Sequence, residues 1–157
     1  MRWIWLVVWL GICSAVAGVS GRFTATEIPG WYRTLVRPRI VPPNWVFGPV
    51  WTILYALMAI AAWRVGQAAP SAMRAWGLGL FIVQLGLNFA WSWIFFRRHA
   101  IGAALAEVVL LWAAIGATTL VFARVASAAA WLMAPYWAWV SFATVLNAAF
   151  WRVNSKG

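Results

Sequence analysis

Charged residues divide the chain into five long apolar segments, each with at most one ionisable side chain inside it. Every segment reaches the roughly 20 residues that an α-helix needs to cross the hydrocarbon core of a bilayer. The pattern therefore predicts an all-α integral membrane bundle of five transmembrane helices, within a single membrane domain over residues 1–157. The segments are Trp3–Gly21, Ile40–Trp63, Ala75–Phe96, Ala100–Ala123 and Val125–Trp151.

The second helix is expected to start late, because prolines fill the beginning of its segment, and we expect Asn44 to be its N-cap. The linker before it, residues 22–43, is long, whereas the other linkers are short. The expected helices cover about residues 3–20, 44–64, 75–96, 100–123 and 128–151.

The first segment allows an alternative interpretation. Arg2, the apolar run after it and Ala15-Val16-Ala17 are together typical of a secretory signal with a small-residue cleavage site. However, the run is long for a signal core, and tryptophans at its start suit the aromatic belt of a retained helix. We therefore treat the segment as a helix. The tryptophans are Trp3, Trp5 and Trp9.

Composition excludes a soluble domain, since 66% of the residues are hydrophobic and only 9% are charged. The formal net charge of +10 is compatible with nucleic-acid binding. The basic residues, however, lie between apolar segments rather than along one polar face, so we expect membrane lipid and no nucleic acid as a partner. The single cysteine, Cys13, excludes an internal disulfide and a thiolate metal cluster.

Arginine and lysine are distributed unequally between the two sides of a five-helix bundle. One side carries four of them: Arg2, Arg64, Arg74 and Arg124. By the positive-inside rule, the richer side is cytoplasmic, which places the linker 22–43 and the C-terminus together in the cytoplasm. That side carries Arg22, Arg33, Arg37, Arg39, Arg97, Arg98, Arg152 and Lys156.

The linker 22–43 runs into an aromatic helix. The stretch GWYRTLVRPRIVPPNWVFGPVWTILY (Gly30–Tyr55) combines basic, proline and aromatic residues, which a plain membrane span does not need. Its prolines stiffen the approach to the helix. Aromatic residues therefore occur both in a shaped loop and on the helix beneath it, and this arrangement predicts a pocket with the loop 22–43 as its lid.

Helical spacing places further unusual residues under this loop. Residues four apart, or in an i, i+4, i+7, i+11 pattern, share one helix face, and the amides among them should turn away from lipid. Counting about 1.5 Å per residue from the cytoplasmic edge places Trp51, Asn88 and Asn147 in the cytoplasmic halves of their helices, beneath the loop. We expect them to line a cavity, although ordinary packing between helices would produce similar stripes. The sets are Phe47, Trp51 and Tyr55; Gln84, Asn88, Trp91 and Phe95; and Pro135, Trp139, Ala143 and Asn147.

These segments resemble the translocator protein family, whose members are also called tryptophan-rich sensory proteins or, in animals, peripheral benzodiazepine receptors. The resemblance covers nearly the whole chain. It is carried by WYRTLVRPRIVPPNWVFGPVWTILY (Trp31–Tyr55), LNFAWSWIFF (Leu87–Phe96) and PYWAWVSFATVLNAAFWRVN (Pro135–Asn154).

The resemblance implies a five-helix bundle, usually a homodimer, with a transport or sensing role. Its pocket under the first loop would bind porphyrins and other tetrapyrroles, such as protoporphyrin IX or haem, and hydrophobic drug-like ligands. The resemblance also implies light-dependent porphyrin breakdown by a tryptophan pair, which would make Trp51 and Trp139 the catalytic residues. A protein whose pocket is incidental to a structural or regulatory role is a third possibility. The implied pocket residues are Tyr32, Pro42, Asn88, Trp91, Trp139 and Ala143.

One segment departs from the family. The sterol-recognition pattern of animal members has a central tyrosine, whereas Leu146–Arg152 has none. Cholesterol is therefore not an expected ligand, and a bacterial source with tetrapyrrole ligands is favoured.

The residue types favour binding over catalysis. Tryptophan and tyrosine faces suit a flat macrocycle, and arginines at the interface suit its propionates. We expect no required cofactor and no metal site, because His99, the only histidine, is expected to face solvent or headgroups. A hydrolytic triad and paired carboxylates are lacking. Glu107, inside a span, is expected to act in ligand or proton handling or in a structural hydrogen bond. The candidate propionate contacts are Arg33, Arg37 and Arg39.

Overall fold

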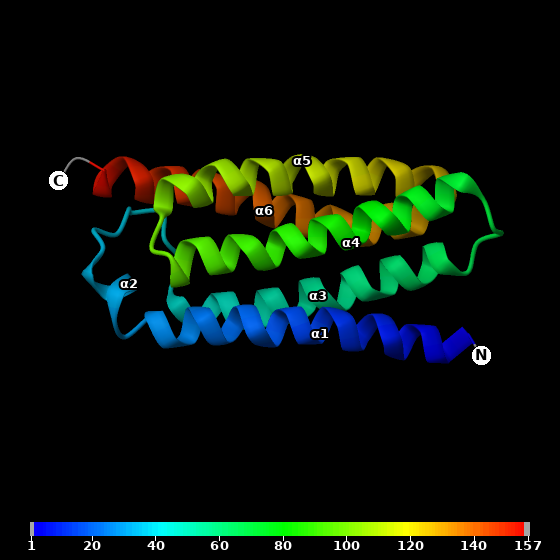
Figure 1. Ribbon diagram of the computed structural model, residues 1–157, viewed down its shortest axis with the longest axis horizontal. Helices are drawn as coiled ribbons and strands as arrows, with labels where there is room; N and C mark the ends of the chain where they lie inside the picture. The colour runs from blue at the N-terminus through cyan, green and yellow to red at the C-terminus, as the bar shows by residue number, and fades with distance from the viewer. Residues whose placement is uncertain (1, 156–157) are drawn as a thin grey trace.

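Five long helices run side by side along the long axis of the molecule (Figure 1). The computed structural model describes residues 2–155. Within them, five helices are long and apolar enough to cross a membrane, which confirms the prediction of an all-α bundle with five spans. The elements are α1 (Arg2–Glu27), α2 (Trp31–Thr34), α3 (Asn44–Gly66), α4 (Ala72–Ser92), the π-helix η1 (Trp93–Arg97), α5 (Ile101–Val125) and α6 (Ser127–Asn154).

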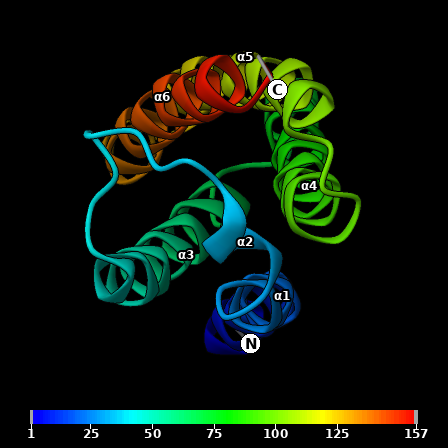
Figure 2. The same ribbon diagram turned by 90° about the vertical axis from the view of Figure 1, so that its left-hand side faces the viewer.

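Viewed from one end, the helices form a ring in the order α1, α3, α6, α5 and α4 (Figure 2). We call residues 28–43, which include α2, the lid. The lid crosses this end of the ring from α1 toward α6 and then returns to α3. The C-terminal end of α6 lies at the same end of the bundle, and the start of α1 lies at the other (Figure 1).

The helix bounds differ from the prediction most clearly at the end of α1. The helix continues to Glu27 rather than ending near residue 20, so the first part of the predicted loop 22–43 is helical. The polar residues there do not break the helix, because their hydroxyls bond within it. The Thr24 hydroxyl donates to the Ser20 carbonyl at 3.2 Å, and the Thr26 hydroxyl donates to the Arg22 carbonyl at 3.1 Å.

The prediction that Asn44 caps α3 is wrong. Pro43 occupies the N-cap position with extended backbone, and Asn44 is the first helical residue. Its side-chain Oδ1 instead accepts a hydrogen bond from Arg37 at 3.1 Å. The proline carbonyl accepts from the Val46 amide at 3.0 Å, so the first turn closes without a side-chain cap. Asn44 thereby attaches the lid to α3.

The last turn of α4 widens into η1. The Arg98 amide donates to the Trp93 carbonyl at 3.1 Å, one residue further back than in an α-helix. Wider turns of this kind occur often at functional sites, because they redirect side chains. Here both Phe95 and Phe96 are buried. They form an aromatic cluster with Tyr32 of the lid and Phe150 of α6.

The larger core cluster lies along the bundle and is made of Met58, Phe81, Phe122, Tyr136 and their neighbours. Helices α5 and α6 approach each other closely at Gly116. A Cβ atom there would lie 2.8 Å from Trp137 Cζ2, so the indole fills the space that a larger residue would need. This core fixes the helices at the end of the bundle that the lid does not cover.

The lid and the C-terminal end of α6 lie at the same end of the bundle, and the charge count predicts that this end is cytoplasmic. We expect single cysteines at Thr34 and Ser155, each in a Cys13→Ala background, to react with a membrane-impermeant maleimide from the cytoplasmic side only. Labelling is measured on right-side-out and inverted membrane vesicles. Reaction from the outside would reverse the assigned orientation, and reaction from opposite sides would contradict the five-span topology.

Candidate ligand-binding site

A cavity of about 420 Å³ lies beneath the lid. Cavities of roughly 300–1,000 Å³ are typical of small-molecule sites. Its walls come from α1, the lid, α3, the α4–η1 region and α6. The lining residues are Ala17, Ser20, Gly21, Thr24, Ala25, Ile28, Tyr32, Asn44, Phe47, Gly48, Trp51, Thr52, Tyr55, Asn88, Trp91, Ser92, Phe95, Phe96, Trp139, Ala143, Leu146, Asn147 and Phe150.

The structure brings most of the candidate site residues around this one cavity. Pro42 is half-buried on the lid and is not among the lining residues. Arg33, Arg37 and Arg39 are exposed and do not line it either. The candidates that do line it are Tyr32, Phe47, Trp51, Tyr55, Asn88, Trp91, Phe95, Trp139, Ala143 and Asn147.

Sequence reasoning missed the α1 wall of the cavity. This wall is built mainly of small residues, which carry no chemical signal of their own. Their spacing does carry one: Ala17, Gly21 and Ala25 recur every four residues, as do Ser20 and Thr24. A stripe of small residues on the helix before the aromatic loop indicates a face that leaves space beside it.

A buried ladder of hydrogen bonds forms the floor of the cavity. The Tyr55 hydroxyl donates to Asn88 Oδ1 at 2.5 Å, and Asn88 Nδ2 donates to the Tyr136 hydroxyl oxygen at 2.9 Å. The Tyr136 hydroxyl in turn donates to Gln84 Oε1 at 2.9 Å. The ladder therefore joins α3, α4 and α6. It fixes the positions of Tyr55 and Asn88, the two members that line the cavity.

A second polar link joins α4, α5 and α6 nearer to the lid. The Trp91 indole N–H donates to Asn147 Oδ1 at 3.0 Å, and Asn147 Nδ2 donates to the Ile101 carbonyl at 2.9 Å. The carbonyl belongs to the first turn of α5. The side-chain amides of Asn88 and Asn147 are both buried. Their hydrogen bonds agree with the prediction that these amides turn inward.

Aromatic rings cover the α4–η1 and α6 side of the cavity. The rings of Trp91 and Phe95 stack with centroids 5.4 Å apart. Tyr32 closes the cavity from the lid, with its ring centroid 5.5 Å from that of Phe150. On α3 and α6, Phe47 and Trp139 meet edge to face at 5.9 Å. The cavity thus has one broad aromatic side and one side of small residues.

The cavity is electrically neutral in the part of the chain that the structure describes, since its lining residues include no charged side chain. A cation is recorded against two lining residues on the exposed side of the lid, and we call this part of the lid the mouth. The Arg37 guanidinium lies 5.8 Å from the centre of the Tyr32 ring and donates to Asn44 Oδ1. Burial raises the pKa of Tyr32 above its usual value, and the nearby arginine opposes this shift. Tyr32 therefore remains a neutral phenol at physiological pH.

Two further titratable residues considered in the sequence, Glu107 and His99, also lie outside the cavity lining. Glu107 is 8% exposed, and neither carboxylate oxygen has a hydrogen-bond partner among the described residues. Glu107 is therefore buried in the interior of the bundle, as expected from the sequence. His99 is bonded to Glu27 rather than merely facing solvent or headgroups. Among residues 2–155, no group of three or more histidine, cysteine or acidic side chains is arranged to hold a metal ion.

Residues 9–152 of the chain match the sequence model of the TspO/MBR family. The chain is 41% identical to tryptophan-rich protein TspO of Chlorobaculum tepidum, over 95% of each sequence. It is 39% identical to protein CrtK of Rhodobacter capsulatus, over 91% of this chain and 89% of that protein. It is also 41% identical to the human translocator protein, over 87% of this chain and 82% of the human one.

Ala143 lies on the α6 wall, one turn from Trp139. If protoporphyrin IX occupies the cavity, Ala143→Thr is expected to weaken its binding about fivefold to thirtyfold, because added bulk and a hydroxyl disturb the wall at a cost of about 1–2 kcal/mol. Binding is measured by fluorescence titration, and folding by circular dichroism. Ala138→Thr, at an exposed position of the same helix, is the matched control. Unchanged affinity in a folded Ala143→Thr variant would remove this residue from the binding wall.

Proposed function

This chain belongs to the TspO/MBR family, and on that premise we propose that it binds porphyrins or related tetrapyrroles beneath the lid, in a transport or sensing role. The observation that carries the proposal is the contrast between a neutral aromatic cavity and a basic mouth. A tetrapyrrole has the same contrast, because its flat ring is apolar and its carboxylates project from one edge.

The ring of such a ligand suits the interior of the cavity. Flat macrocycles gain both buried area and offset or edge-to-face contacts from aromatic side chains. Trp91, Phe95 and Trp139 supply such faces, and the small residues of α1 leave room beside them. Desolvation disfavours placing the carboxylates among these residues.

The charged edge of the ligand suits the mouth. Arg37 already contacts two lining residues, Tyr32 and Asn44, so its guanidinium is held near the opening. A guanidinium can bind a carboxylate through two parallel hydrogen bonds. Arg33 and Arg39 lie on the same lid and are exposed, so they can add to the positive charge there.

The names of relatives support the choice of role. Relatives include translocator proteins of mammals and a tryptophan-rich sensory protein of Cereibacter sphaeroides, which is 35% identical over 98% of this chain. A homodimer is part of the proposal. It is supported by Gly79 and Gly86 on α4, where an added Cβ would meet no atom within 4 Å, so a second helix can approach there.

Sterol binding is not part of the proposal. The segment Leu146–Arg152 lacks the central tyrosine of the recognition pattern, and three of its residues turn into the cavity instead of toward lipid. Those residues are Leu146, Asn147 and Phe150.

Titration of the purified protein with protoporphyrin IX tests the proposal. We expect saturable quenching of tryptophan fluorescence, because several indoles line the cavity, and an affinity that falls when Arg37 is replaced by Gln. Arg124→Gln, an exposed arginine on α5 at the opposite end of the bundle, is the matched control. Absence of saturable quenching in the wild-type protein would overturn tetrapyrrole binding and favour a structural or regulatory role.

One further observation favours a second candidate function, light-dependent porphyrin breakdown. Trp51 and Trp139 line the cavity from two different helices, α3 and α6. A bound macrocycle can therefore contact both indoles. Indole is readily oxidised, and an excited porphyrin in contact with it can exchange electrons with it or sensitise oxygen beside it.

We expect Trp51→Phe and Trp139→Phe to keep the protoporphyrin affinity within about tenfold, a change below ~1.4 kcal/mol, because many other aromatic residues remain. Bleaching of the bound pigment under illumination should fall sharply in both variants. Affinity and absorbance decay are measured on the same samples, with dark controls. Trp131→Phe, on α6 but outside the cavity, controls for the loss of an indole. Bleaching at the wild-type rate in both variants would leave binding without degradation.

A further inference from the structure

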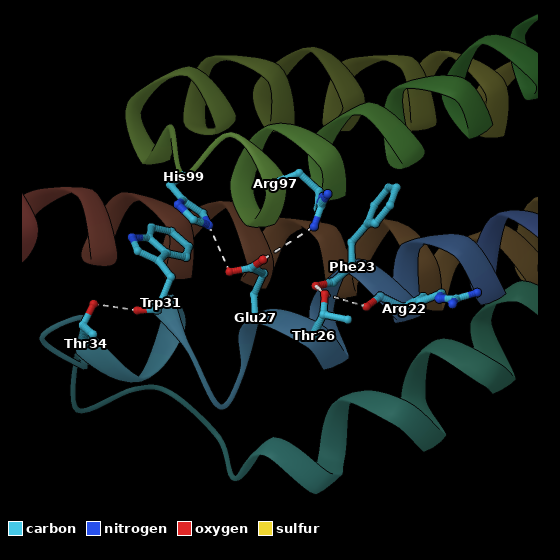
Figure 3. A network of polar contacts seen from close by, with 8 residues as sticks. All are labelled: Arg22, Phe23, Thr26, Glu27, Trp31, Thr34, Arg97 and His99. Carbon is cyan, nitrogen blue, oxygen red and sulfur yellow. Dashed lines mark hydrogen bonds and ion pairs between the residues drawn. The ribbon is translucent and has the colours of Figure 1, made fainter.

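The lid begins at a charged contact between distant parts of the chain. Glu27, the last residue of α1, faces the turn between η1 and α5 (Figure 3). His99 Nε2 lies 3.0 Å from Glu27 Oε2, and Arg97 Nη1 lies 3.8 Å from Glu27 Oε1. The carboxylate is therefore shared between two groups of the same turn.

The same histidine also contacts the lid helix. The imidazole of His99 stacks on the Trp31 ring, with centroids 4.1 Å apart and planes inclined by 11°. Trp31 is the first residue of α2, and its ring also meets that of Phe95 of the cavity wall, edge to face with centroids 5.8 Å apart. His99 thus touches both the last residue of α1 and the first residue of α2.

The backbone of His99 has an unusual conformation. Its φ of 53° is the only positive value recorded for a non-glycine residue in the part of the chain that the structure describes. Such residues are uncommon and lie mostly in tight turns. The conformation lets the short turn after η1 project the imidazole back over Trp31, as Figure 3 shows.

A second, uncharged contact holds the other part of the lid. The Val36 amide donates to Asn154 Oδ1 at 2.9 Å, and Asn154 Nδ2 donates to the Val36 carbonyl at 3.0 Å. Between the two attachments, Tyr32 is buried above the cavity. The lid is therefore fastened on the α4 side by a contact that includes an ionisable pair, and on the α6 side by neutral hydrogen bonds.

We propose that Glu27, His99 and Trp31 form a latch that holds α2 closed over the cavity and sets how quickly molecules enter and leave it. Histidine is the side chain whose charge changes around neutral pH. Protonated imidazole adds an ion pair to its hydrogen bond with Glu27, whereas neutral imidazole keeps at most the hydrogen bond. The latch therefore holds more strongly in weakly acidic solution and loosens as the pH rises.

Two charged groups from different elements belong to this contact. Glu27 on α1 lies 3.0 Å from the His99 imidazole, and Arg97 on η1 lies 3.8 Å from the same carboxylate. Trp31 on α2 is uncharged. The neighbouring Arg98 turns away, because its guanidinium lies over the Trp93 ring at 5.2 Å. Arg98 therefore supplies a matched control position in the same turn.

The first test needs no ligand. Ser20, a small buried residue of the cavity lining, is replaced by Cys in a Cys13→Ala background. A charged, membrane-impermeant thiol reagent then reports how often the lid opens. We expect His99→Asn to raise the reaction rate about tenfold at pH 6. Asparagine tolerates the left-handed backbone of this position, so the turn keeps its shape. Arg98→Gln should leave the rate unchanged.

The pH dependence separates a latch from a purely structural role. The ratio of the rates with and without His99→Asn cancels the ionisation of the reacting thiol itself. We expect this ratio to fall from about ten at pH 6 to about two at pH 8. Trp31→Leu should raise the rate at both pH values, and so should Asn154→Ala, which releases the neutral attachment.

The outcomes are distinct. Equal thiol-labelling rates for His99→Asn and Arg98→Gln at both pH values would overturn the latch. Asn154→Ala is the positive control, because a higher rate in that variant shows that the assay detects an open lid. If the ratio of the labelling rates with and without His99→Asn does not change with pH, the charge of His99 has no part in the latch. The second test rests on the proposed function: His99→Asn should speed dissociation of protoporphyrin IX about tenfold in a chase experiment. If protoporphyrin does not bind at all, the proposed function fails and the thiol measurements still decide the latch.

Discussion

Burying a polar side chain between membrane-spanning helices is costly unless it finds partners inside the protein, and this cost shapes both the bundle and its cavity. The ladder from Tyr55 through Asn88 and Tyr136 to Gln84 meets it by joining three helices. Each hydrogen bond between membrane helices contributes roughly 0.6–2 kcal/mol. Because two members of the ladder also line the cavity, the floor of the site is fixed before any ligand arrives.

The space above this floor results from an unequal choice of side chains. Aromatic residues on η1 and α6 fill their side of the bundle, and the wider turn of η1 places Phe95 and Phe96 inward together. On the opposite side, α1 presents alanine, glycine, serine and threonine, which are too small to fill the remaining volume. Close packing of the other end around Gly116 and Trp137 keeps the helices from collapsing into that volume.

The sequence allowed the five spans and much of the cavity to be predicted, because both depend on regular spacing. Uncharged runs defined the spans, and residues four apart defined the faces that carry Trp51 and Asn147. What could not be predicted depends on contacts between distant residues. Asn44 became a partner of Arg37 instead of a helix cap, and α1 continued to Glu27, where its carboxylate meets the turn after η1. Local preferences carry no information about these partners.

Charge is divided between the cavity and its rim for a physical reason. An ion among the aromatic residues would lose its hydration without a partner, whereas at the lid it keeps contact with water. In the proposed function, recognition of a charged ligand edge therefore falls to the lid, the same segment that the proposed latch holds closed. Arg37 illustrates how both tasks are compatible: a guanidinium has five N–H donors in a fixed plane, and its recorded hydrogen bond is to Asn44. It can hold the lid to α3 and still meet a carboxylate, so the lid can remain closed over a ligand whose charged edge it binds.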